Sequence, residues 1–130
     1  MAAALLLDTH ALIWWLLDDI SLTPTARDAL ATPESRVFVS AASIAEIAIK
    51  LSINKLPLPK ELDDDLLEVV TATGFTPLPV TLEHAHAIRH LPWHHRDPFD
   101  RLLIAQSQVE RLTIVTNDRM IGRYSVDVLW

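Results

Sequence analysis

Short apolar runs of strand length alternate along the chain with segments of helical pattern, and this alternation limits the fold more than any other feature. We read three of the runs as buried strands, at 3–7, 37–39 and 112–115. Two weaker strand candidates lie at 75–80, where two prolines suit a sheet edge, and at 126–130. Strands that alternate with helices build a parallel sheet covered on both faces, so the sequence predicts an α/β fold.

Helical patterns fill the segments between these runs. They cover 9–17, 24–31, 40–54, 59–73, 81–90 and 98–111. Several ends carry local signals: Thr23 before Pro24 and Asp97 before Pro98 are N-cap and first-turn pairs, and Gly74 is a plausible C-cap.

Length and composition bound the class of protein. The 130 residues suit one domain, 1–130, and there is no cysteine for a disulfide scaffold or a thiolate zinc site. The segment MAAALLLD is too short and lacks the basic flank of a signal peptide, and no run is as long as a membrane span. We therefore expect a soluble, cytoplasmic protein without a membrane partner. Its net charge of -6 has the wrong sign for a basic nucleic-acid-binding surface, so such binding needs arginine clusters or bound metal.

Two of the apolar runs lead to aspartates, Asp8 and Asp118. In an open parallel sheet the ligand crevice lies beyond the carboxyl ends of the strands, where the strand order reverses. If the first and fourth strands are neighbours there, the two carboxylates share a crevice. Each aspartate also has a purely structural interpretation, Asp8 as a helix cap and Asp118 as a turn residue.

Three further acidic residues can likewise be read either as members of a site or as purely structural residues. Asp97 suits an N-cap and Asp100 a first helical turn, where the helix dipole favours a negative charge. Glu46 lies in a helix that is apolar on most of its surface. Its structural alternatives are an ion pair with Lys50, worth about 0.2–0.5 kcal/mol, and a capping box with Ser43.

Gathered carboxylates raise one another's pKa and are costly to bury unless a cation offsets them. No lysine follows Lys60, so the late strands offer no ammonium. Mg²⁺ and Mn²⁺ prefer carboxylate and water oxygens, and either would suit phosphodiester hydrolysis, because the metal activates water and stabilises developing negative charge.

The histidines offer a competing zinc site, since His86, His90 and His94 are spaced four apart and three more, His84, His95 and His10, add to the count. Pro92 is expected to end the helix before His94, and no carboxylate recurs at a ligand spacing. Zinc is therefore the less favoured interpretation. His10 is expected to pack or to form hydrogen bonds near the site.

Four stretches, taken together, resemble a known family: DTHALIWWL, SAASIAEIAIKLSINKL, HHRDPFDRLLIAQS and VTND. They occur in the order found in PIN-domain ribonucleases of the VapC toxin type, over nearly the whole chain, and DPFDRLLIAQ is the most specific piece. The resemblance implies a single-domain, three-layer α/β/α sandwich with a mainly parallel sheet. It also implies an acidic site for Mg²⁺ or Mn²⁺ and endonucleolytic cleavage of RNA.

The resemblance assigns roles to particular residues. The family's first acid corresponds to Asp8, its glutamate to Glu46 and its last acid to Asp118. Thr116 stands where the family often has a hydroxyl that supports the site. The third acid is either Asp97 or Asp100, and counting back from IAQS favours Asp100, with Asp97 in support. The resemblance thus implies catalytic roles for Asp8, Glu46, Asp100 and Asp118. It implies metal binding by Asp8, Asp100 and Asp118. The partners implied are RNA, a cognate antitoxin, and a second copy of the chain in a homodimer that can assemble further with the antitoxin.

Two other classes remain as alternatives. A receiver-like signalling domain has a similar length and an acidic Mg²⁺ pocket, but it normally carries paired acids after the first strand and a lysine after the last. The second alternative is a non-catalytic binding module, in which the acids serve as caps. Metal-dependent thermal stabilisation separates this module from an enzyme.

Overall fold

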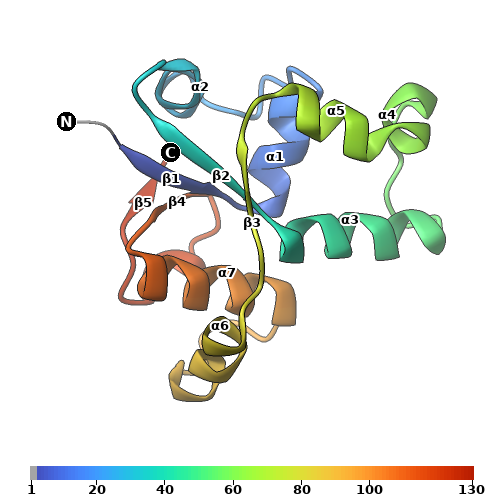
Figure 1. Cartoon of the computed structure of the whole chain (residues 1–130). Helices are drawn as coiled ribbons and strands as arrows, with labels where there is room; N and C mark the ends of the chain where they lie inside the picture. Colours follow the sequence, from blue (N-terminus) through green and yellow to red (C-terminus); the bar gives the residue numbers. More distant parts are fainter. Residues whose placement is uncertain (1–2) are drawn as a thin grey trace.

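A five-stranded sheet, with every strand parallel to its neighbours, forms the centre of the computed structural model, which describes residues 3–130 (Figure 1). The strands are β1 (Ala4–Leu7), β2 (Arg36–Ser40), β3 (Thr76–Leu78), β4 (Thr113–Val115) and β5 (Val128–Leu129). Their order in the sheet is β3-β2-β1-β4-β5. This confirms the predicted α/β class and the edge position of the proline-containing strand. Met1 and Ala2, part of the segment judged too short for a signal peptide, lie outside the described residues.

Seven α-helices accompany the strands within the described residues. They are α1 (Thr9–Leu16), α2 (Pro24–Ala31), α3 (Ala41–Ser52), α4 (Lys60–Asp64), α5 (Leu66–Ala72), α6 (Leu82–Ala87) and α7 (Pro98–Glu110). Short 3₁₀ turns, η1 (Ile88–His90) and η2 (Ile121–Arg123), complete the structure. None of the helices in residues 3–130 has the length and hydropathy of a transmembrane span.

The central strand β1 divides the core into two layers. Its side chains alternate between the faces of the sheet, so Leu5 and Leu7 pack in a cluster with residues of α1 and α2, whereas Leu6 packs with Leu103 of α7. Right-handed crossovers explain the division, because the chain moves in one direction from β1 to β3 and then returns across the sheet to β4. Figure 1 shows α6 and α7 on the opposite side of the sheet from α1 and α2.

Some local predictions were wrong. The helix expected over 59–73 is two helices, because Asp65 leaves the helical region at φ -120° and ψ 29°. The capping box of Ser43 and Glu46 does not form: α3 begins earlier, with the Ser40 hydroxyl accepting from the Ala42 N–H. Gly74 does end α5 with a positive φ of 76°, as predicted.

The strand order also tests the expectation about the crevice. The sheet grows in opposite directions from β1 and β4, which are neighbours, so the order reverses between them. Asp8 follows β1 and Asp118 follows β4 at the same edge of the sheet. The predicted shared position of these two aspartates is therefore present.

Candidate active site

Asp8 and Asp118 both have the local roles that their sequence positions suggested. Asp8 is 4% exposed and caps α1, with Oδ1 accepting from the Ala11 N–H at 2.7 Å. Asp118 accepts from the Met120 N–H at 2.8 Å through Oδ1, while its own N–H donates to Thr116 Oγ1 at 3.0 Å. These hydrogen bonds fix both carboxylates to the backbone at the carboxyl edge of the sheet.

The start of α7 places two more carboxylates at this edge. Asp97 is the N-cap, and its Oδ1 accepts from the N–H groups of Phe99 and Asp100 at 2.8 and 3.1 Å. Pro98 occupies the first helical position, where its missing N–H costs no hydrogen bond. Asp97 thus caps the helix as predicted, and Asp100 lies in its first turn.

Glu46 enters the site from α3, where it is 4% exposed. Its Oε1 accepts from the Thr9 hydroxyl at 2.7 Å, and its Oε2 lies 2.6 Å from Lys50 Nζ. The predicted ion pair is therefore present, but it is not the only environment of the carboxylate. The bond with Thr9 ties α3 to the start of α1 beside the crevice.

The acidic side chains form two overlapping groups whose possible ligand atoms lie within 4.8 Å of one another. One group contains Glu46, Asp97 and Asp100, and the other contains His95, Asp100 and Asp118. Asp100 belongs to both. Asp8 belongs to neither group, although its charge contributes to a raised pKa of Asp100.

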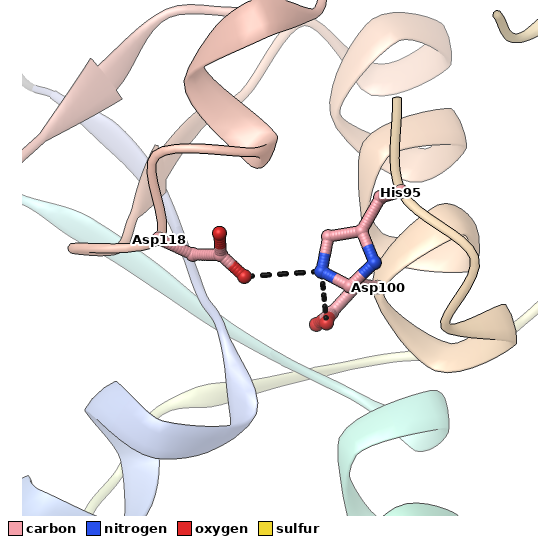
Figure 2. Close-up of side chains that lie close together, drawn as sticks. All are labelled: His95, Asp100 and Asp118. Carbon is pink, nitrogen blue, oxygen red and sulfur yellow. Dashed lines mark hydrogen bonds and ion pairs between the residues drawn. The ribbon is translucent and has the colours of Figure 1, made fainter. Parts of the chain in front are cut away.

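His95 belongs to the site, although the sequence interpretation counted it only among the histidines of the zinc alternative. Its Nε2 lies 3.0 Å from Oδ2 of both Asp100 and Asp118, between the two carboxylates (Figure 2). Its Nδ1 accepts from the Asp97 N–H at 3.1 Å, so the geometry assigns the proton to Nε2, which donates toward the carboxylates. The only sequence signal was its position just before DPFD.

Burial and mutual repulsion shape the charges of the site. Burial, and then the charge of Asp97, raise the pKa of Asp100 from 3.8 to about 7, against the opposing effect of His95. Burial also raises the pKa of Asp8, partly offset by its hydrogen bond with Thr116. The hydrogen bond with Glu46 raises the pKa of the Lys50 ammonium. The carboxylate cluster is thus short of positive charge, although Lys50 supplies some.

The structure does not gather His86, His90 and His94 into a ligand group within residues 3–130. The rings of His86 and His90 are 6.1 Å apart, η1 ends at His90, and His94 packs against Tyr124 instead. His10 lies against Trp14 and its charge lowers the pKa of Asp8, in keeping with the expected supporting position.

Fold and site define an α/β protein with an acidic centre at the switch point of a parallel sheet. The model of the PIN domain family matches residues 5–126, so the chain belongs to that family. The resemblance to PIN-domain proteins that the sequence motifs suggested is thereby confirmed. A comparison with curated protein sequences found no significant match.

Solved structures share the fold at low sequence identity. VapBC2 from Rickettsia felis, bound to a promoter DNA fragment, has a TM-score of 0.75 and 14% identity over 98% of each chain. DNA-bound VapBC from Salmonella typhimurium has a TM-score of 0.72 and 16% identity, over 99% of this chain and 98% of that one. FitAcB from Neisseria gonorrhoeae has a TM-score of 0.62 and 21% identity, over 97% and 96%.

Proposed function

We propose that the protein is a Mg²⁺- or Mn²⁺-dependent endoribonuclease that acts as the toxin of a toxin-antitoxin pair. The observation that carries the proposal is the pair of acidic groups that share Asp100 at the switch point of the sheet. The chain lacks the paired acids after the first strand and the lysine after the last that a receiver-like domain normally carries. Helix capping alone does not explain why carboxylates from α3, α7 and the segment after β4 converge. Membership of the PIN domain family supports the nuclease over both alternatives.

The donor set fits a hard divalent cation. It consists of carboxylate oxygens, which Mg²⁺ and Mn²⁺ prefer, and the raised pKa of Asp100 marks a site where negative charge lacks compensation. Asp8, Asp100 and Asp118 would hold the ion, and Glu46 would complete the acidic wall. When bound, such an ion lowers the pKa of coordinated water and stabilises the negative charge of phosphodiester hydrolysis.

The chain's own residues prepare the site for this chemistry. Thr116 orients the Asp118 backbone and forms a hydrogen bond with Asp8. Thr9 holds Glu46, and Asp97 holds the start of α7. His95 donates toward two of the carboxylates and would keep them from moving apart before a cation binds. These contacts provide a preorganised site of the kind that electrostatic catalysis needs.

Incubation of the purified, partner-free protein with total RNA tests the activity. We expect cleavage with Mg²⁺ or Mn²⁺ and none with EDTA. Thermal unfolding is the second readout, because an ion that binds the folded state stabilises it, by about 2.7 kcal/mol at a hundredfold excess over Kd. Neither cleavage nor metal-dependent stabilisation would favour the binding module, whereas stabilisation without cleavage would favour the receiver-like Mg²⁺ domain. Cleavage in EDTA would exclude metal dependence.

The partner in this proposal is an antitoxin, as in the VapBC complexes whose fold the chain shares. An apolar groove of about 620 Å³ runs beside the edge strand β3 and is suited to an apolar segment of such a partner. Its walls include Ile44, Leu67, Val70, Phe75, Leu78 and Pro79. A basic residue of the partner reaching the acidic groups would exclude the metal, since arginine pairs well with carboxylates. The proposal includes a homodimer, higher assemblies with the antitoxin, and a cytoplasmic location.

A further inference from the structure

Trp93 presents an exposed indole ring in the loop between η1 and α7. The side chain is 74% exposed, although a ring of this size is a large apolar surface to leave in water. One face of the ring is occupied, because the Arg101 guanidinium carbon lies 3.8 Å from the ring centroid. The exposure leaves ring surface free for another flat group.

The loop that carries Trp93 is held firmly to α7. Arg101 is 2% exposed and donates to four backbone carbonyls of the loop. The acceptors are Ile88, Leu91, Pro92 and His95, at distances between 2.8 and 3.3 Å. The Tyr124 hydroxyl donates to the Pro92 carbonyl at 2.8 Å and accepts from the His95 N–H at 2.8 Å. The ring is thus set in place before any ligand arrives, which lowers the entropic cost of binding.

The same loop reaches the acidic site. Two residues after Trp93, the ring of His95 lies between Asp100 and Asp118 (Figure 2). Two residues of chain span at most about 7 Å, so the backbone of Trp93 lies within about that distance of the backbone of His95. The same short loop thus carries both the exposed indole and the histidine that contacts the acidic site.

The charges around this loop differ from those of the whole chain. No acidic residue occurs between Glu83 and Asp97, and the segment contains the exposed Arg89 and Arg96. Two more exposed arginines, Arg119 and Arg123, follow Asp118. Within residues 3–130 the ion pairs made by arginine or lysine side chains are Arg27–Asp18 and Lys50–Glu46, so these four arginines remain free for phosphates. The segments on either side of the acidic residues Asp97, Asp100 and Asp118 thus carry exposed positive charge, which suits the phosphates of a nucleic acid.

We propose that Trp93 is a stacking platform for an unpaired base of RNA bound at the acidic site. The inference rests on the proposed function, because it places the scissile phosphate among the carboxylates. A base has the flat π-face that the exposed ring can accept, and the free arginines suit its phosphates better than they suit an apolar protein surface. Bases in a duplex are stacked on one another, so the platform selects single-stranded RNA.

Trp93→Leu tests the platform, since leucine still covers Arg101 but has no π-face. The probe is a short fluorescein-labelled single-stranded RNA of mixed sequence, alone or annealed to its complement, with binding measured by anisotropy in Ca²⁺, a hard cation that offsets the carboxylates. We expect the Kd for the single strand to rise about tenfold and the Kd for the duplex to change little. Trp93→Phe keeps most of the affinity. Ile20→Ala is the matched control: it removes an apolar side chain that is 95% exposed and lies beyond the far end of α1, and it leaves both constants unchanged.

The outcomes separate this inference from the nuclease proposal. Thermal unfolding first establishes that each variant is folded at the assay temperature, and Trp93→Met, which also lacks a π-face, replaces Trp93→Leu if that variant is not folded. An unchanged Kd, or an equal loss for single strand and duplex, overturns the platform, as does a variant that loses only association with another protein chain. If the wild type binds the single strand through Trp93 but does not cleave it, the platform is supported and the nuclease proposal is wrong. Cleavage by the wild type, together with an unchanged Kd for the Trp93 variant, leaves the nuclease and overturns the platform.

Discussion

Asp100 belongs to both acidic groups and has a pKa raised to about 7, mainly by burial and by the charge of Asp97. Near neutral pH without metal this carboxyl therefore holds a proton more readily than an ordinary aspartate does. A divalent cation competes with that proton, because metal ligands must be deprotonated. Either a proton on Asp100 or a bound metal ion can therefore relieve the repulsion among the carboxylates of the site.

The raised pKa predicts how the stability of the metal-free protein depends on pH. Because the folded-state pKa of Asp100 lies above its ordinary value of 3.8, the folded state binds the proton more tightly than the unfolded chain between pH 3.8 and 7. The free energy of unfolding in EDTA should therefore gain a contribution from Asp100 as pH falls from 8 through 7 toward 5. Urea denaturation at a series of pH values measures it.

Two aspartate variants serve as controls for this pH dependence of stability. Asp100→Asn should lose the part of the pH dependence centred near 7, while Asp97→Asn, which keeps the cap, should move that part to lower pH, because one repelling charge is gone. Identical pH profiles for the wild type and Asp100→Asn would show that the carboxyl titrates normally.

Substitutions of Glu46 and Lys50 provide a second test of the roles of single residues. If Glu46 is part of the active site, Glu46→Gln should reduce RNA cleavage strongly, whereas Lys50→Met should reduce it less. Lys50→Met leaves the Glu46 carboxylate in place but without its ammonium partner, so its cost should appear mainly in the free energy of unfolding. Cleavage rates measured beside urea denaturation distinguish the two; equally small effects on cleavage would reduce Glu46 to a structural ion pair.

Individual residues differed in how far the sequence revealed them. Asp8, Asp97 and Asp118 could be placed because caps and strand ends are local features. His95 could not, because its contact with two carboxylates depends on the path of the whole loop from η1 to α7. Thr9 was missed for a similar reason, since its bond to Glu46 joins positions 37 residues apart.

The loop between η1 and α7 shows how one buried side chain can organise an element. Arg101 donates to loop carbonyls and to the Tyr124 hydroxyl, and so satisfies groups that would otherwise be left without a donor. Arg101→Met should lower the free energy of unfolding by about 3 kcal/mol, because buried acceptors lose their partners. The exposed Arg96 is the matched control, and Arg96→Met should change stability by less than about 0.5 kcal/mol. Urea denaturation of both variants is the measurement, and equal losses would mean that the loop does not depend on Arg101.

Helix boundaries followed the same division between local and distant causes. The starts of α2 and α7 were predictable because a capping side chain and a proline stand together in the sequence. The break between α4 and α5 was not, although consecutive aspartates at 63–65 are poor helix formers. Periodicity alone treats 59–73 as one helix, since it does not register where the backbone leaves the helical region.

For the whole molecule, the sequence predicted the α/β class but not the strand order. Alternating strands and helices fix the parallel sheet, whereas the order β3-β2-β1-β4-β5 depends on which way each crossover turns. That order brings Asp8 and Asp118 to one edge and sets the arginines after β4 beside them. In the proposed function, a chain with a net charge of -6 would thereby combine a cation site with a basic approach for RNA.

Cleavage of RNA by Asp8→Asn, compared with the wild type at saturating Mn²⁺, tests the central claim most directly. Asparagine can still cap α1 through the Ala11 N–H, so the fold should persist while one proposed metal ligand is lost. Asp28→Asn, which changes an exposed aspartate on α2, is the matched control and should cleave like the wild type. We predict that wild type and control degrade the RNA and that Asp8→Asn, folded by its thermal unfolding curve, does not. Full cleavage by Asp8→Asn would contradict the assignment of this acidic centre as the catalytic metal site.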